Sequence, residues 1–504
     1  MRRLPLLLPL ILLVFIACPP GARADEGPSS PFEDQALLEK HLAEACDMIE
    51  AIEGHKFKTR PTVKVSTPKE VAAILTQEFE GMPESVVPAD QREVLARGIA
   101  RLLMAKYEPA KHCIHIIPAG VQLVAKAQPK LGALGLDHLR VLLAHEVTHA
   151  LDFPRYGIVA RRTNTQGADA QQALNAIVEG HAQYVAQEAA KRWNLMPVFD
   201  RLTAAIAGTG VEGGTDTEKA MRAAGLSNIR FAYVEGHTFF AAVAKAQGAA
   251  GVERAMREPP TRSRMIEEPA LWLDPADAEK GPDLGAIAKS FGWLMPTKGW
   301  IRADQRVLAS GLRSQGLRVP PARRAEWMQG FHDAHLFQAQ NPTTGARFVT
   351  VVLHFDSPEN ARLFADLDRL IIENAKAQPG MTFDTKALTK KADAAETVHG
   401  FFMHRIVSYA GEAIDMRQVV AAHGVFTVEM IVINGPHIER THLDRALTRA
   451  MAWMDDPQAA AALPALVAPV EPEKAEPKKP EPKKADPGKL EPKKPEPAGA
   501  GSGG

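Results

Sequence analysis

Two histidines four residues apart, with a glutamate directly after the first, form the stretch of this chain best suited to chemistry. They are His145 and His149, in the sequence Ala-His-Glu-Val-Thr-His-Ala, and the glutamate is Glu146. On a helix both imidazoles lie on one face, where their nitrogens can bind one metal ion at about 2.0–2.1 Å. Glu146 projects about 100° away, beside the ion, where it can accept a proton from water. The stretch therefore has the pattern of a His-Glu-x-x-His zinc motif.

A hydrolytic zinc site also needs a third protein ligand and an open fourth position, so another donor must come from further along the chain. A histidine six residues after His149, as in metzincins, is excluded because Arg155 occupies that position. Glu179, in a Val-Glu-Gly-His string within a helical pattern over residues 168–191, is the favoured ligand. Glu235, in a second Val-Glu-Gly-His string, is the alternative.

These segments resemble a known family. The stretch His-Glu-Val-Thr-His-Ala-Leu, followed by Val-Glu-Gly, is similar to the gluzincin clan of zinc metallopeptidases, to which thermolysin belongs. More narrowly, the chain resembles a group of secreted bacterial HExxH proteins. The resemblance covers roughly residues 35–320 and also includes Lys106-Tyr107-Glu108-Pro109, the run from Cys113 to Pro118, Tyr233-x-x-Gly236-x-x-Phe239 and Pro259-Pro260-Thr261.

The resemblance implies a role for each residue of the motif. Glu146 is the catalytic base in it, and the Zn²⁺ ligands are His145, His149 and Glu179. It further implies that Tyr233 or His237 lines the cleft and donates a hydrogen bond to the oxyanion formed when water attacks a carbonyl. A tyrosine and a histidine in an apolar helix are also common core residues, so both interpretations of this pair stay open.

One position departs from the thermolysin pattern. Those enzymes have an aspartate four residues after the third ligand, where this chain has Gln183. Asp152, three residues after His149, is the favoured substitute, because on a helix it can accept the free N–H of that imidazole. It can equally be an acid near a helix end. His181 points away from the face of Glu179, so we expect it to be structural.

The amino terminus has the features of an export signal. Met1-Arg2-Arg3 precedes an apolar run over residues 4–17, and Ala22-Arg23-Ala24 is a small-x-small cleavage site. We therefore expect residues 1–24 to be a signal peptide and the mature protein to be secreted, periplasmic or associated with the cell envelope. Lipid attachment through Cys18 is the alternative. No later segment reaches the length of a transmembrane helix.

Composition limits the classes of partner. The 504 residues include 60 basic and 60 acidic side chains and carry no net charge. That balance offers no basic surface, so we expect no nucleic-acid partner. The length predicts about two to three domains. Beyond the signal peptide two cysteines remain, Cys46 and Cys113, which either pair in an oxidising compartment or lie buried as small apolar residues.

The first domain is predicted to be mainly helical. Residues 33–53 predict an amphipathic helix, residues 62–66 a short strand, and Thr67-Pro68-Lys69-Glu70 the capped start of a second helix. His115 lies in another strand-like run, where hydrogen-bonded histidines are more common than ligands. Together with the helix expected around HExxH, this indicates a zincin-like α+β peptidase domain over residues 25–318 with a short edge sheet.

The pattern changes at Arg318-Val319-Pro320-Pro321, which interrupts the helical periodicity. Residues 319–457 form the second predicted domain, with strands at 348–355, 401–407 and 425–433 and helices at 358–376 and 441–454. The simplest arrangement is an antiparallel sheet with helices on one face, a smaller α+β domain whose role stays open. Repeated Pro-Glu-Pro-Lys-Lys units predict a disordered tail over residues 458–504.

Taken together, these features predict a secreted zinc-dependent hydrolase, a metallopeptidase that acts on a peptide or protein substrate with water as the nucleophile. A second interpretation is a zincin-fold protein of the cell envelope that no longer cleaves and acts as a binding or scaffold module. Gln183 and the large second domain favour that interpretation. A third is a helical envelope protein in which the His-Glu-x-x-His string is accidental.

Overall fold

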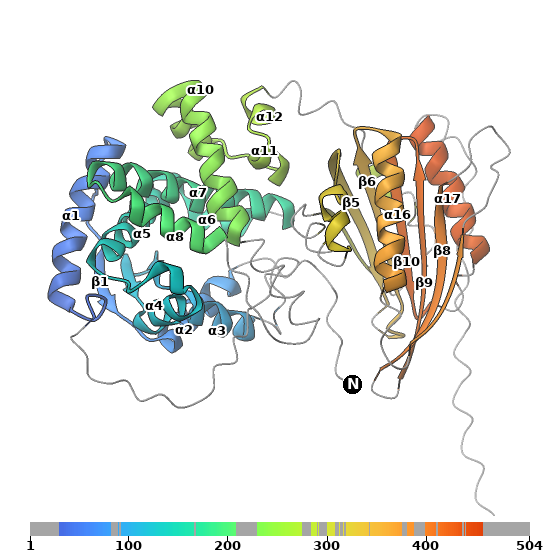
Figure 1. The fold of residues 1–504 in the computed structure, drawn as a ribbon, viewed down its shortest axis with the longest axis horizontal. Helices are drawn as coiled ribbons and strands as arrows, with labels where there is room; N and C mark the ends of the chain where they lie inside the picture. Colours follow the sequence, from blue (N-terminus) through green and yellow to red (C-terminus); the bar gives the residue numbers. More distant parts are fainter. Residues whose placement is uncertain are drawn as a thin grey trace, which may run out of the picture.

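The structure is a computed structural model in which the chain forms two successive parts, the first mostly helical and the second built on a large sheet (Figure 1). The described residues are 30–81, 89, 92–165, 168–207, 229–274, 284–289, 291, 300–307, 312, 316, 319–341, 343–374, 381–387, 399–409, 412–435, 438 and 440–456. The expected signal peptide with Cys18, and the expected tail, lie outside them.

The first part contains a three-stranded sheet surrounded by helices. Its strands follow the order β1-β3-β2, with β1 parallel and β2 antiparallel to the central β3. Its elements are α1 (Gln35–Glu53), β1 (Thr62–Val65), α2 (Pro68–Glu80), α3 (Arg92–Leu102), β2 (Ala105–Glu108), β3 (Cys113–Ile116), α4 (Pro118–Ala127), the 3-10 turn η2 (Pro129–Leu131), α5 (Leu136–Tyr156), α6 (Ile158–Asn164), α7 (Ala168–Arg192), α8 (Met196–Ala207), the π-helical turn η3 (Phe231–Glu235), α10 (Gly236–Arg257), α11 (Ser263–Glu267) and α12 (Ala270–Leu273).

Helix α5 occupies the centre of this part because it is apolar around most of its circumference. Leu139, Leu143, Val147 and Ala150 are all fully buried, and helices α1 and α7 and the small sheet share one core with them. Gly157 ends the helix in the left-handed conformation, with φ of 62°. The helix expected around HExxH is therefore confirmed. Among the described residues, no helix combines the length and the apolarity needed to cross a bilayer.

The start of α2 also follows the sequence expectation. Thr67 accepts a hydrogen bond from the backbone N–H of Glu70, and the Glu70 carboxylate accepts one from the backbone N–H of Thr67. This reciprocal cap satisfies two backbone donors that the first turn would otherwise leave unpaired. The two cysteines are free and buried, so the expected alternative of a disulfide between Cys46 and Cys113 is not realised.

The second part is built on a seven-stranded sheet in the order β4-β5-β6-β10-β9-β8-β7, in which all neighbours are antiparallel. Its elements are α14 (Leu284–Lys289), β4 (Ile301–Arg306), the 3-10 turn η6 (Pro321–Glu326), β5 (Phe331–Gln340), β6 (Arg347–Phe355), α16 (Pro358–Asn374), β7 (Met381–Ala387), β8 (His399–Tyr409), β9 (Glu412–His423), β10 (Phe426–Ile433) and α17 (Arg440–Asp455).

Helices cover both faces of this sheet, so the expectation of helices on one face is wrong. In β6, Val351 and Leu353 share a core with α16, whereas Phe348 and Val352 belong to a separate core with α14 and α17. A strand buried on both faces has consecutive apolar residues rather than an alternating pattern. The run Val-Val-Leu in β6 has that property.

The second part also begins earlier than the boundary predicted at residue 318. Strand β4 pairs with β5, and Leu284 and Ile287 of α14 lie in the core with α17. The prolines at residues 320 and 321 start the short turn η6 inside this part rather than separating two domains.

Candidate metal centre

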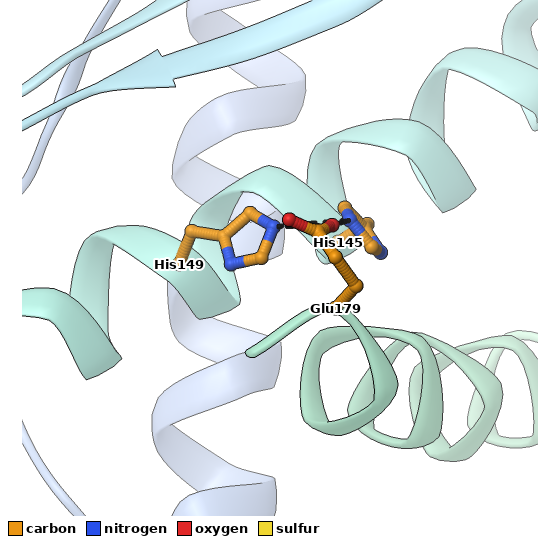
Figure 2. A group of neighbouring side chains, drawn as sticks. All are labelled: His145, His149 and Glu179. Carbon is orange, nitrogen blue, oxygen red and sulfur yellow. Dashed lines mark hydrogen bonds and ion pairs between the residues drawn. The ribbon is translucent and has the colours of Figure 1, made fainter. Parts of the chain in front are cut away.

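Helices α5 and α7 bring three side chains to one point (Figure 2). The Nε2 atoms of His145 and His149 lie 3.1 Å apart, and Oε2 of Glu179 lies 3.3 Å from each of them. The two histidines follow from their spacing on α5, and the glutamate comes from the middle of α7. The two expected histidine ligands and the favoured third ligand are thus brought together.

The separations within this triad, His145, His149 and Glu179, fit a bound metal ion. An ion with tetrahedral ligands at about 2.0–2.1 Å holds the ligand atoms about 3.3–3.4 Å apart. The observed separations of 3.1 and 3.3 Å approach those values. Two imidazole nitrogens that face each other across such a distance, with one carboxylate oxygen beside both, form a donor set that could hold a metal ion.

Burial and charge prepare the triad for a cation. His145 and His149 are each only 6% exposed. Burial acts to raise the pKa of Glu179, but the neighbouring imidazoles of His149 and His145 hold it well below its usual range. Burial also acts to lower the pKa of His145, but the Glu179 carboxylate, helped by Glu146, raises it. Glu179 is therefore an ionised carboxylate, the form that binds a metal.

Glu146 lies beside the triad rather than in it. Its side chain is nearly buried, with 7% exposure. Its negative charge acts on both His145 and Tyr233, and it raises the pKa of each. Glu146 directly follows His145 on α5, so it belongs to the surroundings of the triad and is not one of the three grouped donors.

Tyr233 joins the centre from the π-helical turn η3. Its ring stacks on that of His145, with the centroids 5.4 Å apart and the planes 12° from parallel. Burial, followed by the charges of Glu179 and Glu146, raises the pKa of Tyr233 well above its usual range, so its hydroxyl stays protonated. Hydrogen bonding with Glu179 contributes to that shift. Single π-helical turns often occur at functional sites, and this one carries a donor to the edge of the triad.

A close helix crossing explains how η3 and α7 come together. A Cβ atom at Gly180 would overlap the backbone of Gly236, and one at Gly236 would overlap the carbonyl oxygen of Ala176. Only glycine permits this approach at either position. The two Val-Glu-Gly strings of the sequence therefore meet at their glycines, although they belong to no structural repeat.

Glu235 and His237, the other candidates from the second string, lie elsewhere. Glu235 is 3.7 Å from Arg230 and is not part of the triad. Nε2 of His237 is 3.2 Å from Oε1 of Gln187, and its ring lies 6.0 Å from that of Phe199. Gln187 is eight residues beyond Glu179, about 12 Å along the helix. His237 therefore contacts a later part of α7 than the part that carries Glu179, and of the two candidates for the cleft it is Tyr233 that lies against the triad.

Asp152 also has a different partner from the one expected. Its Oδ2 atom accepts a hydrogen bond from Nδ1 of His181 at 2.7 Å, and His149 Nδ1 has no hydrogen-bond partner among the described residues. The expectation that Asp152 orients His149 is thus wrong, because α7 places an imidazole directly against that carboxylate. The structural role expected for His181, which is completely buried, is confirmed.

Gln183 lies next to His145, in the position where thermolysin-like enzymes have an aspartate. Its amide group helps to raise the pKa of His145, although Nδ1 of that histidine has no partner of good hydrogen-bond geometry among the described residues. The Gln183 amide also donates to Oγ1 of Thr203 at 3.0 Å. Gln183 therefore lies beside His145 but, unlike an aspartate, brings no negative charge to it.

Arg162, from the short helix α6, is a neighbour of the triad that the sequence did not indicate. Its Nη2 atom lies 3.7 Å from Oε1 of Glu179, the oxygen that does not face the imidazoles. Its guanidinium group lies over the ring of Phe153, 5.1 Å from the centroid. Arg162 is one of two consecutive arginines in a polar helix and matches no sequence motif. Its contact with Glu179 could therefore not be predicted from the sequence.

A second constellation with catalytic residue types is sealed from solvent. Ser66 Oγ lies 2.9 Å from Nδ1 of His115, and Nε2 of His115 lies 2.9 Å from Oε2 of Glu108. All three side chains are buried, with 4% exposure for Ser66 and none for His115. A substrate could not reach this serine, so the group is a hydrogen-bonded link between three strands, as expected for His115.

Comparison with protein-family models, with curated proteins and with solved structures gave no match to this chain. Its function must therefore be inferred from the residues that could hold a metal ion.

Proposed function

We propose that this protein is a secreted zinc-dependent hydrolase, a metallopeptidase of the gluzincin type that acts on peptides or proteins. The convergence of His145, His149 and Glu179, whose ligand atoms lie 3.1 to 3.3 Å apart, supports this most strongly. Glu146 immediately beside them supplies the group that a hydrolase needs and a purely structural metal site does not.

Zinc is the ion that best suits these donors. Two imidazole nitrogens and one carboxylate oxygen are the protein ligands of many hydrolytic zinc sites, which keep a fourth position open. Calcium and magnesium prefer sites made only of oxygen atoms. With no cysteine among the described residues of the centre, a structural site of the thiolate kind does not apply.

The chain's own residues can divide the remaining work of peptide-bond hydrolysis. A bound zinc ion supplies Lewis acidity, which acidifies water and polarises a carbonyl group. Glu146 accepts the proton of the attacking water and delivers it to the nitrogen of the breaking C–N bond, so the amine leaves neutral. Tyr233 presents a hydroxyl donor at the edge of the triad for the developing oxyanion. No covalent bond between enzyme and substrate is required.

Replacing Glu146 by glutamine tests this proposal. We expect Glu146→Gln to retain zinc, because the residue is not a ligand, and to lower peptide cleavage by about 10²–10⁴-fold, because the base is lost. Cleavage of a mixed peptide library, followed by mass spectrometry with and without a chelator, gives the activity, and metal analysis gives the zinc content. Glu188→Gln on α7, which removes an acid paired with Lys191, is the matched control and should cleave like the parent. Parental cleavage by Glu146→Gln would exclude Glu146 as the base.

A second candidate is a zinc-binding envelope protein that has lost cleavage. The uncharged Gln183 beside His145, where a thermolysin-like enzyme has an aspartate, favours it. A parent protein that holds zinc yet cleaves no member of the library, in the presence or absence of chelator, would support this candidate. A parent protein that holds no zinc would contradict both.

A further inference from the structure

We infer that Asp152 and His181 are positioning residues of the metal centre: the buried hydrogen bond between them sets how closely Glu179 approaches His145 and His149. The inference rests on the proposed metal site. It concerns the helices that carry the ligands rather than the ligands themselves.

The pair joins these two helices within one turn of the ligands. Asp152 lies three residues after His149 on α5, and His181 lies two residues after Glu179 on α7. Their Nδ1 and Oδ2 atoms are 2.7 Å apart, and each side chain is 1% exposed. Three residues of helix span about 4.5 Å, so a shift of either helix at this pair moves the ligands by a comparable amount.

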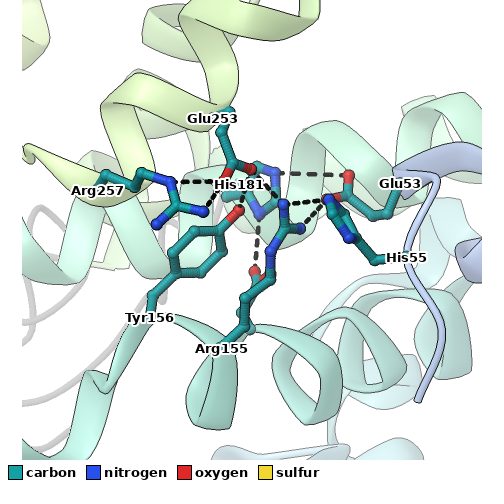
Figure 3. A network of polar contacts seen from close by, with 8 residues as sticks. Glu53, His55, Arg155, Tyr156, His181, Glu253 and Arg257 are labelled. Carbon is teal, nitrogen blue, oxygen red and sulfur yellow. Dashed lines mark hydrogen bonds and ion pairs between the residues drawn. The ribbon is translucent and has the colours of Figure 1, made fainter. Parts of the chain in front are cut away.

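Further charged groups hold His181 in place from other helices (Figure 3). Glu53, near the end of α1, lies 3.7 Å from Nε2 of His181. Arg155 pairs with Glu53 at 3.2 Å and also with Glu253 of α10. The Tyr156 hydroxyl donates to the same Glu253 carboxylate at 2.6 Å. His181 therefore lies between two carboxylates in a network that includes α1, α5, α7 and α10.

A metal centre requires this kind of support because its tolerances are small. Ligand distances in protein sites vary by about 0.2 Å, and residues that hold ligands in place typically change metal affinity by about 10–100-fold when they are removed. The hydrogen bond between Asp152 and His181 fixes a separation between α5 and α7, and neither residue belongs to the group that could hold the ion. Its loss should therefore weaken the metal site without removing a ligand.

The chain offers a matched control in the pair of Glu108 and His115. That pair is also a buried carboxylate and imidazole, 2.9 Å apart, but it joins β2 to β3 and neither strand carries a ligand. Asp152→Ala and Glu108→Ala should therefore both destabilise the metal-free protein. Only Asp152→Ala should weaken metal binding.

The experiment compares zinc affinity with stability in the full chain. Competition with a chromophoric chelator measures affinity, the visible absorption of Co²⁺ reports ligand geometry, and urea unfolding of the metal-free protein measures stability. We expect Asp152→Ala to bind zinc about 10–100-fold more weakly than the parent and to show an altered Co²⁺ spectrum. Asp152→Asn, which can still accept a hydrogen bond from His181, should recover most of the affinity. Glu108→Ala should bind zinc within about twofold of the parent.

Four outcomes would overturn the inference. Asp152→Ala could bind zinc like the parent, or Glu108→Ala could lose as much affinity as Asp152→Ala, which would make the loss a general effect of stability. If the alanine variant does not fold, His181→Leu takes its place, because it removes the same hydrogen bond while filling the space, and a parental affinity and Co²⁺ spectrum in that variant would count against the inference. A parent protein without zinc affinity would overturn both the proposed function and this inference. If the parent binds zinc and only the variants behave differently from expectation, this inference alone fails.

Discussion

Helices α5 and α7 hold two buried histidine clusters a few residues apart. Comparing them shows how a candidate metal ligand differs from a structural histidine. In the triad the ring nitrogens of His145 and His149 point at each other and share one carboxylate oxygen. In the other cluster the imidazole of His181 lies between the carboxylates of Asp152 and Glu53. The first arrangement offers three converging donor atoms that could hold a cation, whereas the second places an imidazole between two carboxylates of the chain itself.

The charge states of the two clusters follow from this arrangement. Burial acts to lower the pKa of His181, but Asp152 and Glu53 raise it to about 9, so its ring carries a proton at neutral pH. An imidazole that keeps this proton has no free lone pair for a metal ion. In the triad two imidazoles share the single charge of Glu179. Burial alone therefore does not identify a metal ligand, and the direction of the nitrogen atoms does.

The largest effect should come from removing the Glu179 carboxylate, which is the third donor of the triad. Glu179→Gln should abolish zinc retention through dialysis and all cleavage, because two imidazoles alone do not form a hydrolytic zinc site. Glu235→Gln, in the second Val-Glu-Gly string and ion-paired with Arg230, should keep both zinc and activity. Metal analysis and the peptide-library assay measure the two properties. If Glu235→Gln lost zinc while Glu179→Gln kept it, the assignment of the third ligand would be reversed.

A smaller effect should separate Tyr233 from His237. Tyr233→Phe removes the hydroxyl at the edge of the triad and should lower the turnover number by about 10²–10³-fold, the usual cost of losing one oxyanion donor, with zinc retained. His237→Gln should leave turnover unchanged, because its contacts are with Gln187 and Phe199. Steady-state kinetics on one cleaved peptide would compare them. Equal losses in both variants would contradict the distinction that the structure makes between these two residues.

The sequence predicted the parts of the centre that depend on local spacing. His145 and His149 share a face because both lie on one helix, and Glu179 was the favoured carboxylate in the following helix. The partners of Asp152 and His237 could not be predicted in the same way, because they depend on where α5, α7 and α10 cross. That crossing is determined by contacts such as the one between Gly180 and Gly236, which are 56 positions apart.

The sheet of the second part also shows that structure determined by distant contacts cannot be predicted from local sequence patterns. The strands with continuous apolar runs, β6, β8 and β10, were predicted, whereas β4, β5, β7 and β9 were missed. In β9 the sequence Glu-Ala-Ile-Asp-Met-Arg-Gln places charged and polar residues among the apolar ones. Such a segment becomes a strand through its pairing with neighbours on both sides, which no local pattern reveals.

The smallest effect concerns a half-buried carboxyl group, that of Glu429, which has an amide as its partner instead of an imidazole. The Gln418 amide donates to Oε1 of Glu429 at 2.6 Å and lies 3.4 Å from Oδ2 of Asp368. Burial raises the pKa of Glu429 from 4.5 to about 7, although the Gln418 hydrogen bond opposes the shift. The folded protein therefore binds this proton more tightly than the unfolded chain does. The contribution of Glu429 to the free energy of unfolding is greatest below pH 4.5 and is lost as the pH rises to 7.

Glu429→Gln should remove this dependence, because glutamine is neutral at every pH. We expect the variant to be more stable than the parent at pH 8 by about 1–2 kcal/mol, with the side chain only partly shielded from solvent, and to lose that advantage at pH 4.5. Urea unfolding of the full chain at the two pH values, followed by circular dichroism, measures the difference. Glu359→Gln, at an exposed position of α16, should show no such trend. A gain that is equal at both pH values would mean that Glu429 is ionised in the fold, and that burial with an amide neighbour is not enough to keep a carboxyl group protonated.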